Sequence, residues 1–80
     1  MTTYNGHKNR SHWNQSLWIF NDESLYRLAQ NMVSASFDYD TGARHLETAA
    51  RNFIDCLDTD KTPDGIKWSV SGVKAALNDI

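Results

Sequence analysis

Apolar side chains recur along the chain with the spacing of helices. The clearest run follows the i, i+3, i+4, i+7, i+8 pattern of an amphipathic helix and consists of Leu25, Leu28, Ala29, Met32 and Val33. Asn21 precedes this run as a good N-cap, and Asp22 and Glu23 place carboxylates at the positive end of the helix dipole. The pattern therefore predicts a helix over residues 22–35.

A second amphipathic run follows a break at residues 36–40. Its buried stripe is expected to consist of Ala43, Leu46, Ala50, Phe53, Ile54 and Leu57. Either Asp40 or Thr41 can cap this helix, and Glu47 and Arg51 form a favourable i,i+4 pair on the opposite face. The prediction is a helix that ends near residue 57.

A shorter amphipathic pattern lies at the C-terminal end, beyond a loop. Residues 58–65, DTDKTPDG, hold the single proline and several turn formers, which predicts an irregular loop. Ser69 is suited to cap a helix, and Trp68 and Val73 then have the spacing of a hydrophobic staple. The apolar positions of this helix are Val73, Ala76, Leu77 and Ile80. Residues 66–70 alternate enough to be a strand candidate as well.

The first predicted helix spans about residues 12–20, with Ser11 as its cap, and is apolar on almost every side. The residues that fall on one face at 100° per residue, and are expected to line the core, are Trp13, Leu17 and Phe20. Trp18 projects about 140° away from the first of these. Its side chain is therefore either covered by another helix or exposed to a partner.

Four short helices with brief connections predict a compact all-α bundle. We interpret residues 1–80 as a single helical domain, because a chain of 80 residues has room for one core. Residues 1–10, with Asn5-Gly6 and several polar side chains, are expected to form an N-terminal arm.

Charge and segment composition exclude several classes of protein. Lysine and arginine number 8 against 10 aspartates and glutamates, and the net charge of −2 argues against affinity gained by neutralising many phosphates. The first ten residues do not resemble a signal peptide, and no stretch approaches the roughly 20 apolar residues of a membrane span. We therefore expect a cytoplasmic protein that does not contact a membrane.

The cysteine and histidine residues show no pattern of a catalytic site. Cys56 is the single cysteine, so it cannot form an internal disulfide, and its place beside the apolar stripe predicts a buried or half-buried thiol. His7 and His12 are five residues apart, a spacing that does not align two metal ligands on a helix. These two residues and His45 are expected to be exposed polar side chains.

The aspartates of residues 58–65 resemble the start of a calcium-binding loop. Asp58 and Asp60 occupy its first and third places, but Pro63 stands where the sharp turn needs glycine, and Ser69 where a bidentate glutamate should close the site. A solvated loop is the better interpretation. The sequence thus predicts a protein with no catalytic residues, no metal and no cofactor.

Acidic residues concentrate between positions 38 and 64, where seven carboxylates against three basic side chains leave a net charge of −4. Such a segment is either a solvated surface or an acidic surface that docks on a basic groove of a partner. The residues predicted to bind a partner are Trp18, Asp38, Asp40, Asp55, Asp58, Asp60 and Asp64.

The N-terminal third resembles a family of small, mostly uncharacterised proteins encoded by tailed phages and mobile elements. The residues that carry the resemblance are Tyr4-Asn5-Gly6, Asn9, Trp13, Leu17-Trp18, Asn21-Asp22-Glu23 and Leu25-Tyr26. His7 stands where that family usually has tryptophan, and Ser24 where glycine is common. The motif is specific over residues 4–26, and Trp68 resembles the tryptophan before the family's last helix.

The resemblance implies a viral origin and no known enzymatic activity. Small phage proteins without catalytic motifs commonly bind host machinery, and several anti-CRISPR inhibitors have this size. The leading hypothesis is therefore a non-enzymatic inhibitor, a monomer or homodimer, that binds a host protein or ribonucleoprotein complex such as a CRISPR effector. It would block target DNA binding by covering a basic surface.

Two other functions remain open at this point. A small regulator could contact nucleic acid directly through Lys8, Arg10 and His12, although the net charge disfavours this. An enzyme that uses histidine and aspartate residues ranks last, because no spacing supports it.

Overall fold

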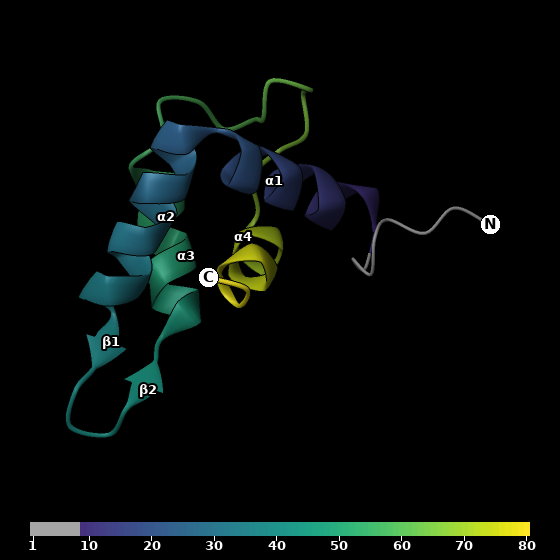
Figure 1. The fold of residues 1–80 in the computed structure, drawn as a ribbon. Coiled ribbons are helices and arrows are strands. Elements are labelled where there is room, and N and C mark those ends of the chain that lie inside the picture. Colours follow the sequence, from purple (N-terminus) through teal and green to yellow (C-terminus); the bar gives the residue numbers. More distant parts are fainter. Residues whose placement is uncertain (1–8) are drawn as a thin grey trace.

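The computed structural model of the chain describes residues 9–80, and in this range it shows four helices and one short hairpin. In chain order the elements are α1 (Arg10–Asn21), α2 (Glu23–Ala35), β1 (Phe37–Asp38), β2 (Ala43–Arg44), α3 (Leu46–Asp55) and α4 (Val70–Leu77). The strand β1 follows α2, the chain reverses in the hairpin, α3 returns beside α2, and α4 packs under α1 and against α3 (Figure 1). The predicted compact all-α bundle is confirmed.

Side-chain caps mark the starts of three helices. Asn9, Asp22 and Ser69 each accept a hydrogen bond from the backbone N–H three residues later. The predicted cap Ser69 is confirmed. The predictions of Ser11 and Asn21 are wrong, because both residues belong to α1 itself, whereas Asn9 and Asp22 have the extended backbone that a cap requires. The predicted N-terminal arm lies mostly outside the described residues, and its last residue already belongs to α1.

The core lies where α3 and α4 meet α1 and α2. Its buried apolar side chains are Ile19, Ala29, Ala49, Ala50, Phe53, Trp68, Val73, Ala76 and Leu77. The rings of Phe53 and Trp68 meet edge to face, with centroids 5.7 Å apart. The stripes predicted for residues 22–35 and for the last helix are confirmed, since their members are buried or pack against this core.

The face of α1 that packs on the core differs from the predicted one. The buried residues of α1 are His12, Asn14, Gln15, Ser16 and Ile19. The prediction that Trp13, Leu17 and Phe20 line the core is wrong: the first two are half-buried, and Phe20 is 39% exposed. The physical reason is that the polar side chains on the other face find hydrogen-bond partners, so that their burial costs little.

Side chains of α1 fix the loop of residues 56–68, which ends at the N-cap of α4. Asn14 Nδ2 donates to Asp64 Oδ2 at 2.7 Å, and Asn14 Oδ1 accepts a hydrogen bond from Thr62 Oγ1 at 2.7 Å. Trp18 Nε1 donates to the same oxygen of Asp64 at 2.9 Å. Three side-chain hydrogen bonds therefore hold this loop against α1.

Gln15, which is fully buried, joins α1 to the start of α4. Its Oε1 accepts the backbone N–H of Ser69 at 2.9 Å, and its Nε2 donates to Ser69 Oγ at 3.2 Å and to Ser11 Oγ at 2.9 Å. A Cβ atom on Gly72 would lie 2.6 Å from Gln15 Oε1, so only glycine leaves room for the amide. We call the set that joins α1 to the loop and to α4 the α1 polar network: Asn14, Gln15, Trp18, Thr62, Asp64 and Ser69.

The hairpin was not predicted. β1 and β2 pair antiparallel, with Phe37 opposite Arg44 and Asp38 opposite Ala43. Its turn places Gly42 at a φ of +73°, a conformation that favours glycine. The sequence pattern had assigned Ala43 to the buried stripe of a helix, but this residue is exposed in β2.

The hairpin also shortens the helix that follows. Asp40 and Thr41 do not cap α3, because they lie in the turn, where their backbone N–H groups donate to Asp38 Oδ1. α3 begins at Leu46 and ends at Asp55, two residues before the predicted end. The remaining apolar positions of the predicted stripe do face the core.

Arg44 ties the hairpin to the end of α4. Its Nη2 donates to the backbone oxygens of Leu77 at 2.7 Å and Ile80 at 3.0 Å. A cation at this position also interacts favourably with the negative end of the helix dipole. Arg44 is therefore exposed but bonded within the fold, and it belongs to β2 and not to the following helix.

The loop of residues 56–68 is irregular, as the sequence predicts for residues 58–65. Among the described residues, the β-type backbone pairing of this loop is limited to one isolated antiparallel bridge, between Lys61 and Lys67. The strand candidate at residues 66–70 does not form a strand, since Ser69 already caps α4.

Gly72→Ala should destabilise the fold, because the added methyl group overlaps the buried amide of Gln15. We expect a loss of about 1–3 kcal/mol in the free energy of unfolding, measured by urea denaturation followed by circular dichroism. Lys74→Ala on the exposed side of the same helix is the matched control and should change stability by about 0.5 kcal/mol or less. Equal midpoints for wild type and Gly72→Ala would contradict this packing.

Acid should weaken the attachment of the loop through Asp64. Hydrogen bonds from Asn14 and Trp18 hold the pKa of this carboxyl below its ordinary value of 3.8. The stabilisation is therefore present above that ordinary value and is lost as the pH falls through the lower pKa of the folded chain.

Asp64→Asn removes this titration, so its urea midpoint should fall less than that of wild type between about pH 5 and pH 2. Asp58→Asn in the same loop is the control, because its carboxylate accepts no hydrogen bond from the described residues. Parallel pH profiles for wild type and Asp64→Asn would refute the role of this carboxylate.

Candidate partner-binding surface

A hollow of about 640 Å³ lies between the end of α2, the hairpin and α3. It is open to solvent and is lined by Ala35, Ser36, Phe37, Asp38, Tyr39, Asp40, His45, Thr48 and Asn52. We call its polar and aromatic part the hairpin surface, which consists of Phe37, Asp38, Tyr39, Asp40 and His45. This surface forms one end of the molecule, away from the loop that connects α3 to α4 (Figure 1).

Tyr39 is the most exposed large hydrophobic side chain of the described residues, with 82% of its surface accessible. Its ring meets that of Phe37 nearly edge to face, with centroids 4.8 Å apart and an angle of 75° between the planes. The ring is therefore supported on one side and free on the other. Sequence reasoning missed this residue, although the alternation of aromatic and acidic residues in FDYD was a visible signal.

Asp38 is held in a fixed orientation by the turn. Its Oδ1 accepts the backbone N–H groups of Asp40 at 2.9 Å and Thr41 at 3.3 Å. The hydrogen bond from the Asp40 backbone first, and then those from the side chain and backbone of Thr41, hold the pKa of the Asp38 carboxyl below its ordinary value. The other oxygen, Oδ2, lies 4.0 Å from His45 Nε2, beyond hydrogen-bond distance. Asp38 therefore presents a charged oxygen at the hollow.

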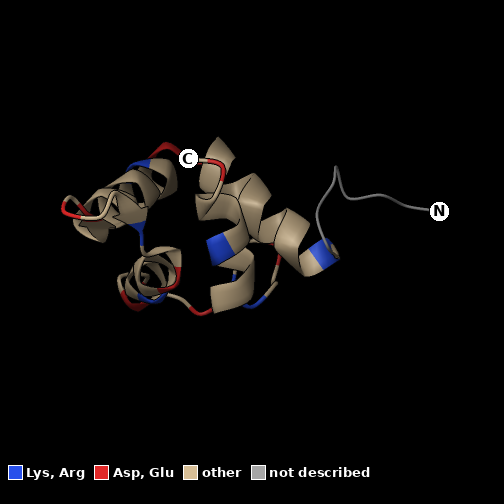
Figure 2. Ribbon diagram, turned by 90° about the horizontal axis from the view of Figure 1, so that it is seen from below, with Lys and Arg blue, Asp and Glu red and all other residues tan. Residues whose placement is uncertain are grey.

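The predicted acidic residues do not form one face. Asp38 and Asp40 lie on the hairpin, whereas Asp55, Asp58 and Asp60 lie at the end of α3 and in the following loop, at the opposite end of the molecule (Figure 1). Acidic and basic residues are distributed over several elements when the molecule is viewed from below (Figure 2). Of the predicted carboxylates, only Asp38 and Asp40 therefore lie beside an exposed aromatic side chain, that of Tyr39.

Trp18 and Asp64 are engaged with each other within the domain. Trp18 is half-buried against the core, and its indole N–H donates to Asp64. The sequence left Trp18 either covered by the domain or exposed to a partner, and the structure shows it partly covered by the domain. A contact of either residue with a partner stays a prediction.

The residues proposed for direct contact with nucleic acid are not assembled into one exposed patch. Arg10 is exposed at the start of α1, and Lys8 lies outside the described residues. His12 is buried, contrary to expectation, because α4 covers it, and its Nε2 lies 2.9 Å from Ser71 Oγ. His45, by contrast, is exposed as predicted.

Cys56 is exposed, so the prediction of a buried or half-buried thiol is wrong. The physical reason is that Cys56 is the C-cap of α3, where the chain leaves the helix. Among the described residues there is no group of three or more side chains that could hold a metal ion.

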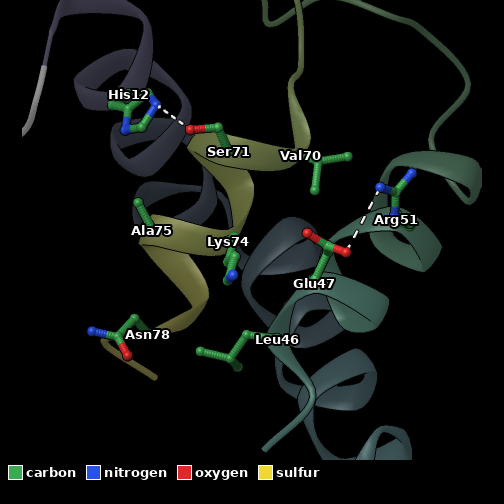
Figure 3. A pocket seen from close by; sticks show the side chains of 9 residues that line it. All are labelled: His12, Leu46, Glu47, Arg51, Val70, Ser71, Lys74, Ala75 and Asn78. Atoms are coloured by element: carbon green, nitrogen blue, oxygen red, sulfur yellow. Dashed lines mark hydrogen bonds and ion pairs between the residues drawn. The ribbon is translucent and has the colours of Figure 1, made fainter.

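A second hollow of about 620 Å³ lies between α3 and α4, below His12 (Figure 3). Apolar side chains such as Leu46 and Val70 alternate there with the Glu47–Arg51 pair, whose charged atoms are 3.8 Å apart. Lys74 projects from α4 into the same space (Figure 3). This second hollow is lined by charges of both signs and by no Phe, Trp or Tyr side chain. It therefore lacks the features that mark the hairpin surface.

The whole chain, residues 1–80, matches the model of a family of unknown function, DUF7249. The chain belongs to this family. Comparison with curated proteins and with solved structures finds no match. No helix in the described part of this DUF7249 member is both long and apolar enough to cross a membrane.

Proposed function

We propose that the chain is a phage-encoded, non-enzymatic binding protein that docks its hairpin surface on a basic surface of a host defence complex. The observation that carries the proposal is Tyr39, which is 82% exposed and stands between two acidic residues of a short turn. An exposed aromatic side chain on a fixed support is a typical anchor of protein interfaces.

The flanking carboxylates define the kind of surface that fits. Asp38 keeps its negative charge well into the acid range, because backbone N–H groups lower its pKa. Negative groups around an aromatic anchor favour a positively charged partner and accelerate the encounter with it. The docking energy would come from Tyr39 and the orientation from Asp38 and Asp40.

A CRISPR effector is the first target to test. The sequence resemblance to small phage proteins supports a viral setting, and CRISPR effectors hold nucleic acid in a positively charged channel. A protein seated on such a channel would block target DNA binding inside the host cell. Direct binding of nucleic acid by this chain is not favoured, because His12 is buried and the net charge is −2.

The proposal is tested with purified effector–guide complexes. Wild type should co-elute with the target effector and inhibit its binding to target DNA. Tyr39→Ala should weaken that complex by about tenfold to a hundredfold, since loss of an interface anchor costs about 2 kcal/mol. The variant should remain folded, because this side chain is largely exposed.

The control for general loss of negative charge is the pair Asp58→Asn and Asp60→Asn, which removes two carboxylates at the opposite end of the molecule. This control should change affinity by less than about threefold. The proposal would be refuted if no effector forms a stable complex with the chain and the binding of target DNA by the effectors is unchanged.

A further inference from the structure

We infer that the hairpin surface selects arginine side chains of its partner over lysine side chains. This inference rests on the proposed function, because it specifies the chemistry of the basic surface that the hairpin contacts. It follows from three consecutive residues of the hairpin that line the hollow, which contribute the carboxylates of Asp38 and Asp40 and the ring of Tyr39.

The two carboxylates are available as acceptors. Asp38 is one of the residues that line the hollow; its Oδ1 holds the turn, and its Oδ2 lies 4.0 Å from His45 Nε2. The Asp40 carboxylate has no hydrogen bond or ion pair with the described residues. A cation that enters the hollow therefore meets one carboxylate held by the turn, Asp38, and one that forms no hydrogen bond or ion pair with the described residues, Asp40.

The ring of Tyr39, which stands between the two aspartates in the sequence, favours a planar cation. The edge-to-face contact with Phe37 supports one side of Tyr39 and leaves the rest of its surface exposed. A guanidinium group can stack on such a ring while its edge donates two parallel hydrogen bonds to a carboxylate. An ammonium group is a strongly hydrated point charge and cannot satisfy both contacts in the same way.

The remaining wall of the hollow accepts the aliphatic part of an arginine side chain. Ala35, Thr48 and Asn52 are uncharged and lie on the ends of α2 and α3 that flank the hairpin. The methylene stem of arginine can pack along such a wall while its charged head reaches the carboxylates. His45 is the single basic residue of the lining, so little positive charge opposes the incoming cation.

The test uses two acetylated and amidated peptides, Gly-Arg-Gly-Arg-Gly and Gly-Lys-Gly-Lys-Gly, added to the full chain at about pH 8, where an ordinary imidazole is neutral. Backbone amide shifts are followed by NMR. The arginine peptide should bind about tenfold more tightly than the lysine peptide and should shift residues 37–45. Tyr39→Leu keeps an apolar side chain but removes the ring, so the ratio of the two affinities should approach one.

Asp60→Asn in the opposite loop is the control and should leave that ratio unchanged. Equal affinities of the wild type for both peptides, or shifts centred outside the hairpin, would overturn arginine selection. Such a result would leave capture of an effector by the hairpin standing. Conversely, failure to capture any effector would refute the proposed function. The ratio of the affinities for the two peptides would still decide whether the hairpin surface selects arginine.

Discussion

The hydrogen bonds of Gln15 are the constraint on which the rest of the structure depends. A fully buried amide binds the N-cap residue of α4, and the same helix provides a glycine where the amide needs space. At the other end of α4, Arg44 binds the terminal carbonyl groups. The last helix is therefore fixed at its start by α1 and at its end by the hairpin. Because buried polar groups are costly when unpaired, this arrangement tolerates few alternatives.

The same connections explain why a hairpin with two-residue strands can support a binding surface. An isolated hairpin of this length would be unstable in water. Here Arg44 anchors one strand to α4, and Asp38 closes the turn by accepting two backbone N–H groups. Asp38 thus supports both the shape and the charge of the surface. The exposed ring of Tyr39 is consequently presented on a fixed base, which would limit the entropy lost in the proposed docking.

Sequence patterns predicted the helices well where apolar periodicity decided the packing. The stripe of α2, the buried Phe53 and the Ser69 cap all followed from spacing and capping rules. α1 was oriented wrongly because its buried face is polar, and periodicity cannot reveal which amides will find distant partners such as Asp64. The hairpin was missed because its strands are too short to alternate. Consequently, Asp38 and Asp40 were selected by charge alone, and Tyr39 was not selected.

The central claim is that this DUF7249 member binds a basic partner through its hairpin. The most direct measurement is amide hydrogen exchange of the chain, free and bound to an effector with which it co-elutes. We predict slower exchange on binding at residues 37–45 and unchanged exchange in the loop of residues 56–68. Protection of that loop or of the outer face of α1, with the hairpin unchanged, would contradict the account.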